Sequence, residues 1–73
     1  MTLDKAIECM CTMDTAIIEV HNDKDEVVSL LEDKVHNLIP EMNILKFSNY
    51  EVLFITAMRK DVLGVVVKEN TKQ

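Results

Sequence analysis

Turn-forming residues, cysteine and large aromatic residues are scarce in this sequence of 73 residues. It contains one glycine, one proline, two cysteines, two phenylalanines, one tyrosine and no tryptophan. Tight β-hairpins commonly rely on Gly, Asn-Gly or Pro to reach the backbone angles of their turns. So few turn formers argue against a meander of many strands and favour an all-α fold.

The two cysteines, Cys9 and Cys11, are too close in sequence to tie distant elements together, as disulfides do in small secreted domains. A reducing compartment suits them better. Residues 1–20 mix charged side chains into their apolar positions, unlike a secretory signal. No uncharged run reaches the roughly 18 residues that a membrane span needs. We therefore expect a cytoplasmic protein with no membrane attachment.

Motifs that would carry catalysis or hold a cofactor are also lacking. The sequence has no G-x-x-x-x-G-K-[ST], G-x-G-x-x-G or H-E-x-x-H pattern and no EF-hand loop. Cys9, Cys11, His21 and His36 are soft metal ligands, but two cysteines two positions apart on a helix point about 200° apart. We expect no enzymatic activity, no cofactor and no metal site, and we interpret the histidines as surface or capping residues.

Apolar residues recur at helical spacing in the first half of the chain. One set predicts an amphipathic helix over 3–20 with Thr2 as its N-cap: Leu3, Ala6, Met10, Met13, Ile17 and Val20. A second set predicts a helix over 24–39, capped by Asn22 or Asp23 and ended by Pro40: Val27 or Val28, Leu31, Val35 and Leu38.

Residues 49–63 have two interpretations. Ser48 to Glu51 form a capping-box pattern, and a helix over 49–63 would place Gly64 just beyond its end. The segment is also rich in β-branched and aromatic residues, so 51–68 could instead be a β-hairpin. Because its turn at 59–61 lacks Gly, Asn and Pro, we predict one all-α three-helix domain over 1–73. The alternative is an α+β fold with two helices followed by that hairpin.

Acidic residues are concentrated in one part of the chain. The net charge is −5, and residues 14–33 hold seven acidic residues against Lys24 alone. If the first two helices fold back on each other, these carboxylates gather near their shared corner and could dock a basic protein surface. No basic face emerges, so we expect no direct nucleic-acid binding. The predicted acidic patch consists of Asp14, Glu19, Asp23, Asp25, Glu26, Glu32 and Asp33.

The hydrophobic fraction, 48%, is large for a chain that can bury only roughly 60% of its unfolded surface. A second subunit would cover the excess, so we expect a homo-oligomer in which Phe54→Asp disrupts both assembly and folding. The predicted interface consists of Tyr50, Leu53, Phe54, Met58 and Val62.

The sequence thus predicts a small acidic homo-oligomeric protein-interaction module, regulatory or inhibitor-like, which binds a partner protein. Compact size and acidic balance are typical of accessory proteins of phages and mobile elements. Two alternatives remain open. One is a nucleic-acid mimic that uses the acidic patch at 14–33, and the other is a small-ligand-binding protein with its site between subunits.

Overall fold

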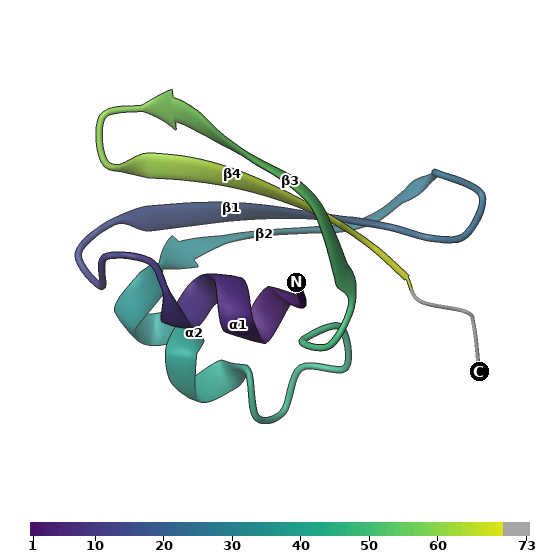
Figure 1. The fold of residues 1–73 in the computed structure, drawn as a ribbon, viewed down its shortest axis with the longest axis horizontal. Helices are drawn as coiled ribbons and strands as arrows, with labels where there is room; N and C mark the ends of the chain where they lie inside the picture. Colours follow the sequence, from purple (N-terminus) through teal and green to yellow (C-terminus); the bar gives the residue numbers. More distant parts are fainter. Residues whose placement is uncertain (70–73) are drawn as a thin grey trace.

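A four-stranded mixed sheet with two short helices makes up the computed structural model, which describes residues 1–69 (Figure 1). The strand order is β2-β1-β4-β3, in which β1 and β4 are parallel and both outer pairs are antiparallel. The prediction of an all-α, helical domain is therefore wrong. The elements are α1 (Leu3–Glu8), β1 (Thr15–His21), β2 (Val27–Lys34), α2 (Val35–Glu41), β3 (Glu51–Arg59) and β4 (Val62–Lys68).

Only the beginning of the predicted helix over 3–20 is helical. Helix α1 ends at Glu8, and after a turn the chain enters β1. Ile17, Ile18 and Val20 are β-branched, which suits a pleated strand, and burial alternates along β1 as a strand requires. The apolar residues at 17 and 20 continue the helical spacing by coincidence. In this segment the spacing therefore does not distinguish a helix from a strand.

The predicted helix over 24–39 is divided between β2 and α2. The first backbone N–H groups of α2 donate to carbonyl oxygens in the loop before β1, from Val35 to Asp14 at 2.8 Å and from His36 to Thr12 at 3.1 Å. These bonds satisfy donors that a helix start leaves free, so α2 begins where it meets that loop. Pro40 lies inside α2, which extends one residue beyond it.

The predicted helix over 49–63 is instead strand β3 and the turn into β4, as in the alternative interpretation of this segment. The turn between β3 and β4 contains no glycine, and Asp61 adopts the positive φ, 63°, that a glycine would commonly supply there. Aspartate tolerates this left-handed region better than most residues. The turn between β1 and β2 uses the same solution at Asp25, whose φ is 65°. The scarcity of glycine therefore does not exclude hairpins in this chain.

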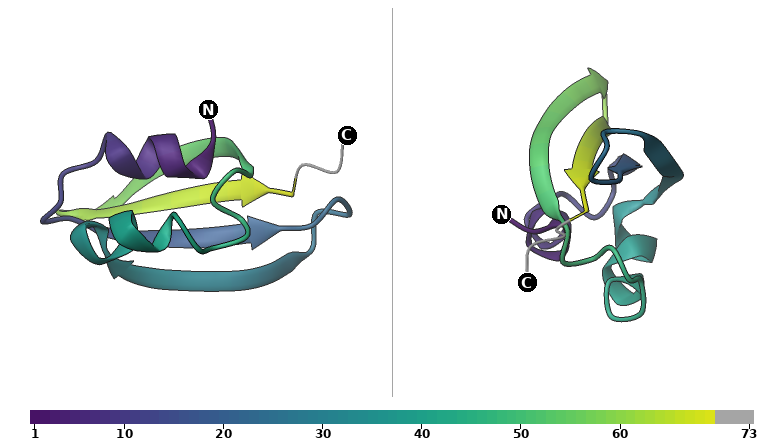
Figure 2. Two further views of the ribbon diagram at one scale, coloured as in Figure 1. Left: turned by 90° about the horizontal axis from the view of Figure 1, so that it is seen from below. Right: turned by 90° about the vertical axis from the view of Figure 1, so that its right-hand side faces the viewer.

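The helices pack on one face of the sheet and create the core there (Figures 1 and 2). Each strand contributes alternate side chains to this face, and within residues 1–69 the other face carries no helix. Neither helix is long and apolar enough to cross a membrane, among residues 1–69. The buried cluster consists of Leu3 and Ile7 from α1, Val35 and Leu38 from α2, Met42 beyond α2, and Ala16, Ile18, Val20, Val65 and Val67 from β1 and β4.

The N-terminus is bound to the beginning of β3. The Val52 N–H donates to the Met1 carbonyl at 2.8 Å, and the Leu3 N–H donates to the Tyr50 carbonyl at 3.0 Å. The Met1 ammonium forms an ion pair with Glu51 at 2.9 Å. These contacts fix α1 against the sheet and occupy the outer edge of β3 at its first two residues.

Candidate interaction surface on the open face of the sheet

The helix-free face of the sheet, here called the open face, carries the alternate side chains that do not enter the core. On β1 the buried Ile18 points to the helices, so its neighbours Ile17 and Glu19 lie on the open face. The register with β2 places Leu30 opposite Glu19, and therefore on the same face. The central residues of the open face are Ile17, Glu19, Leu30, Phe54, Thr56, Met58, Gly64 and Val66.

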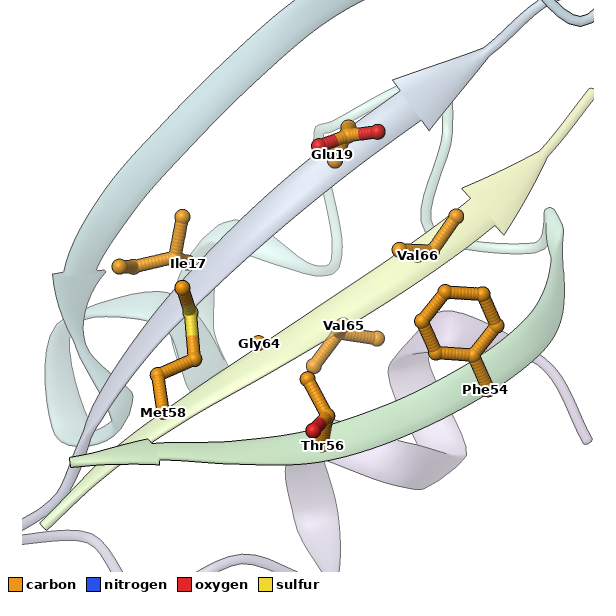
Figure 3. Close-up of a pocket in the computed structure, with 8 residues that line it drawn as sticks. All are labelled: Ile17, Glu19, Phe54, Thr56, Met58, Gly64, Val65 and Val66. Atoms are coloured by element: carbon orange, nitrogen blue, oxygen red, sulfur yellow. The ribbon is translucent and has the colours of Figure 1, made fainter. Parts of the chain in front are cut away.

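A shallow hollow of 250 Å³ lies on this face, over β1, β4 and β3 (Figure 3). Figure 3 shows Met58 beside Ile17 at one end and Phe54 beside Val66 at the other. Glu19 is the one ionisable residue that lines it. The surface is therefore apolar, with a single carboxylate at its margin. The remaining lining residues are Thr56, Gly64 and Val65.

Gly64 allows side chains of β3 to lie across β4. A Cβ atom at this position would stand 2.9 Å from the Met58 Sδ atom and 3.3 Å from the Thr56 Cγ2 atom. A side chain at 64 would therefore displace Met58 from the hollow. The glycine has a role in the shape of the open face, and not in the helix end predicted for it.

Replacement of Gly64 by alanine should change this surface more than it changes stability. The contacting end of Met58 is flexible and can move, so we expect the free energy of unfolding to change by less than about 1 kcal/mol. Methyl-region NMR should show displaced Met58 resonances in the variant, and urea denaturation should give its stability. A loss of several kcal/mol, with Met58 unmoved, would show that Gly64 serves the core instead.

Large apolar side chains are exposed on the open face and along β3. Leu30 is 66% exposed, Phe54 is 56% exposed and Met58 is 52% exposed. Leu53 and Ile55, also on β3, are 50% and 43% exposed. An apolar surface of this kind in a protein of this size indicates an interaction site.

The structure distributes the predicted acidic patch along the β1–β2 hairpin instead of gathering it at a helical corner. Asp14 and Asp33 lie at one end of the hairpin, and the turn at the other end carries Asp23, Asp25 and Glu26. The seven residues of β1 separate these ends by about 20 Å at the usual rise of a strand. The corner does not form because both segments are strands. Glu19 and Glu32 lie between the ends, on the open face.

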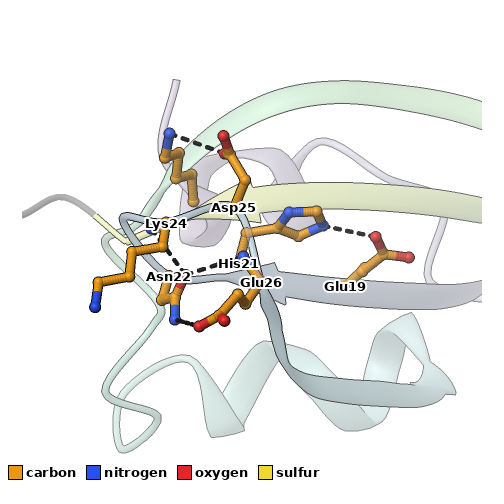
Figure 4. Close-up of polar contacts among 7 residues, drawn as sticks. Glu19, His21, Asn22, Lys24, Asp25 and Glu26 are labelled. Carbon is orange, nitrogen blue, oxygen red and sulfur yellow. Dashed lines mark hydrogen bonds and ion pairs between the residues drawn. The ribbon is translucent and has the colours of Figure 1, made fainter.

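Several of these carboxylates have partners within the chain (Figure 4). Asp25 forms an ion pair with Lys68 at 2.9 Å, and Glu19 lies 2.6 Å from the His21 Nε2 atom. The Asn22 side chain donates to Glu26 at 2.9 Å. These contacts stabilise the turn and the ends of β1 and β4, which reduces the charge that the patch offers to a partner.

Hydrogen bonds hold the pKa of two of the patch carboxyls below their ordinary values. For Asp25 the cause is the hydrogen bond from Lys68, followed by the charge of that lysine. For Asp33 the causes are the hydrogen bonds from the Asn37 side chain and the Lys34 backbone N–H. A lowered pKa in the folded state favours folding only while the carboxyl is ionised.

The lowered pKa of Asp25 predicts a loss of stability in acid. Its contribution is present above about pH 4, the ordinary pKa of aspartate, and is lost as the pH falls through the lower folded-state value. We expect the melting temperature to fall below pH 4, and Asp25→Asn to flatten part of that fall. The effect should be small because Asp25 is exposed. Circular dichroism melts from pH 2 to pH 7 test this; a wild type and variant with the same pH profile would contradict it.

The predicted interface residues lie in two environments. Leu53, Phe54 and Met58 are exposed on β3. Tyr50 is partly buried against the core, with its ring centroid 6.2 Å from that of Phe47, and Val62 is partly buried at the start of β4. The sequence did not single out Leu30 as a surface residue; alternation along a strand at 27–34 was the signal that could have found it.

The cysteines and histidines have surface positions. Cys9 and Cys11 are both free and exposed, in the turn after α1, so the helical argument against their chelating one ion does not apply. Within residues 1–69, no group of three or more His, Cys, Asp and Glu side chains is arranged to hold a metal ion. His21 contacts Glu19, and His36 is exposed on α2.

Comparison of the chain with protein-family models, with curated proteins and with solved structures finds no match.

Proposed function

We propose that this chain is a non-catalytic, homo-oligomeric protein-interaction module of the cytoplasm, which binds a partner protein through the open face of its sheet. The observation that carries the proposal is the apolar open face, which neither helix of the described chain covers. Leu30, Phe54 and Met58 are each more than half exposed on it. A regulatory or inhibitory role follows if that partner is an enzyme or a receptor.

The chemistry of the open face favours a protein partner. Its apolar side chains gain from contact with other apolar groups, and methionine adapts to surfaces of different shape. By strand register the open face carries Glu19, Glu32 and Glu51 against Lys34, Arg59 and Lys68, so it offers phosphate groups no excess of positive charge, and the net charge of the chain is −5. The exposed free thiols of Cys9 and Cys11 suit a reducing compartment.

Mimicry of a nucleic acid is a weaker proposal because the acidic side chains are spread over both ends of the hairpin. Asp25 and Glu26 also interact with side chains of the chain itself. An apolar docking surface requires neither a dense array of charges nor a fixed spacing between them. We therefore propose apolar docking and not charge mimicry.

Leu30→Asp tests the proposal, with Ile44→Asp as its matched control. Both positions expose a large apolar side chain, but Leu30 lies on the open face, whereas Ile44 is 81% exposed in the loop after α2. Each protein is immobilised and incubated with extract of the native host, and bound proteins are identified by mass spectrometry at low and high salt. A partner that binds the wild type should bind Ile44→Asp and be lost with Leu30→Asp.

Apolar docking should also persist at high ionic strength, since salt screens charge interactions and leaves apolar contacts intact. Equal loss of the partner from both variants would contradict the assignment to the open face. Binding that disappears steeply with salt would instead favour the acidic residues of the hairpin.

A further inference from the structure

Strand β3 is the last strand of the sheet and has an unpaired outer side (Figure 1). Within residues 1–69, the backbone that lies against this side is the N-terminus, where Val52 bonds to Met1 and Thr2 bridges Glu51. Residues 53–59 therefore present unpaired backbone groups, and this segment is called the free edge below.

The free edge is apolar, and its β-bulges, between Val52 and Phe54 and between Ala57 and Arg59, leave residues 54–57 as a regular strand. Leu53, Phe54, Ile55 and Met58 are exposed on it, and no charged residue precedes Arg59. Edge strands of folded proteins are usually protected by charged side chains, because unpaired apolar edges join to other strands. The opposite edge of the sheet has such protection, since β2 ends in three consecutive charged residues, 32–34.

We propose that the free edge pairs with the free edge of a second copy of this chain, antiparallel about a two-fold axis at Thr56. This inference rests on the proposed function, because it specifies how copies of the proposed homo-oligomer join. The product is a continuous eight-stranded sheet with the open faces of both copies on one side.

The position of the axis follows from what limits the free edge. Met1 and Thr2 occupy the edge as far as Val52, and β3 ends at Arg59. The free segment 53–59 has its midpoint at Thr56. An antiparallel pair about this point places Phe54 opposite Met58 of the second copy and Ile55 opposite Ala57, with apolar contacts on both faces.

Charge also favours a second copy as the partner. The register of β3 with β4 places Glu51 opposite Lys68 and Arg59 opposite Val62, so both residues lie on the open face. In the proposed pair, the Arg59 end of each β3 lies beside the Glu51 end of the second copy, where Glu51 also pairs with its own Met1 ammonium, and the two-fold axis repeats this arrangement. Because β3 carries opposite charges at its two ends, two copies of β3 that pair antiparallel bring unlike charges together at each end.

The proposed pair is closed. A two-fold interface uses the same surface on both copies. Because this surface is buried in the dimer, no further copy can bind to it. The outer edges of the eight-stranded sheet are then the two β2 strands, with their charged residues 32–34. The expected product is a dimer and not a fibre.

Single cysteines on β3 test the register, in a Cys9→Ser, Cys11→Ser background. Thr56→Cys should form a disulfide-linked dimer under mild oxidation, because the two thiols face each other across the axis. Ile55→Cys alone and Ala57→Cys alone should not, because identical residues are then diagonal neighbours about 7–8 Å apart, too far for a disulfide. A mixture of the Ile55→Cys and Ala57→Cys chains should cross-link. Non-reducing gel electrophoresis reads out all four cases.

Glu32→Cys, on the edge strand β2, is the matched control, and far-ultraviolet circular dichroism checks each fold before oxidation. Thr56→Cys should cross-link at least about tenfold faster than Glu32→Cys. Equal rates would overturn the proposal. A dimeric wild type in which Ile55→Cys links to itself would also overturn it, while leaving the proposed self-association intact.

Hydrogen exchange of the wild type supplies a test that needs no substitution. Amides within residues 53–59 should exchange more slowly at concentrations where the dimer forms than after dilution to monomer. A dimer whose protected amides lie on β2 and not on β3 would overturn the proposal. A protein that is folded and monomeric at all concentrations would overturn both this inference and the proposed homo-oligomer.

Discussion

Replacement of Ile18 by alanine should lower the free energy of unfolding by about 2–5 kcal/mol, the usual cost of a cavity at a fully buried isoleucine. Ile18 is 0% exposed on β1, between the sheet and the helices. Replacement of Ile17 by alanine should cost roughly 1 kcal/mol, because Ile17 lies on the open face and is only partly buried. Urea denaturation of both variants measures the difference.

This pair of variants separates the strand from the helix that the spacing of apolar residues predicts over 3–20. In that helix, Ile17 belongs to the buried stripe and Ile18 does not. A larger loss of stability for Ile17→Ala than for Ile18→Ala would therefore contradict β1 and favour the helix. Val20, buried in either structure, is a suitable reference position.

Replacement of Phe54 by aspartate should dissociate the dimer without unfolding the chain. Phe54 is 56% exposed in one copy, so its loss leaves no cavity in the core. In the proposed dimer it would lie opposite Met58 of the second copy, and the two-fold axis would repeat that contact. We expect the dissociation constant to rise by about a thousandfold, since a central aromatic contact is commonly worth 2 kcal/mol or more per site.

The expected retention of folding in Phe54→Asp differs from the expectation drawn from the sequence, which places Phe54 in an amphipathic helix. Sedimentation velocity should show a monomer, and circular dichroism should show a spectrum like that of the wild type. Ile44→Asp, which introduces the same charge in the loop after α2 and outside β3, should leave the dimer intact. An unfolded Phe54→Asp chain, or a dimer of unchanged affinity, would contradict the account.

The fold was poorly predictable from this sequence for physical reasons that particular residues illustrate. In 15–21, Ile17 and Val20 continue the helical spacing of the preceding residues, whereas Ala16, Ile18 and Val20 follow strand alternation, so the positions of the apolar residues fit both structures. The β-branched residues of that segment were the better signal. The scarcity of glycine also argued wrongly against hairpins, because Asp25 and Asp61 adopt the positive φ values that glycine commonly supplies in turns.

Surface properties were easier to predict from the sequence than the order of the strands. Leu53, Phe54 and Met58 were predicted as oligomer-interface residues, and all three are exposed on β3, whereas Tyr50 and Val62 of the same set are partly buried; the interface itself stays a prediction. Residue type and chain length were the basis of that prediction, whereas Leu30 could be placed on the open face only once its pairing with Glu19 was known. The pairing of β1 with β4 joins residues about fifty positions apart, and no local pattern encodes such a contact.

The mass of the wild-type protein in solution tests the central claim most directly. Size-exclusion chromatography with light scattering at micromolar concentrations should give twice the 8.4 kDa mass of the chain, with dissociation on dilution. A folded protein that keeps a mass of 8.4 kDa at every concentration would contradict the account, because β3 and the open face would then be stable in water without a second copy.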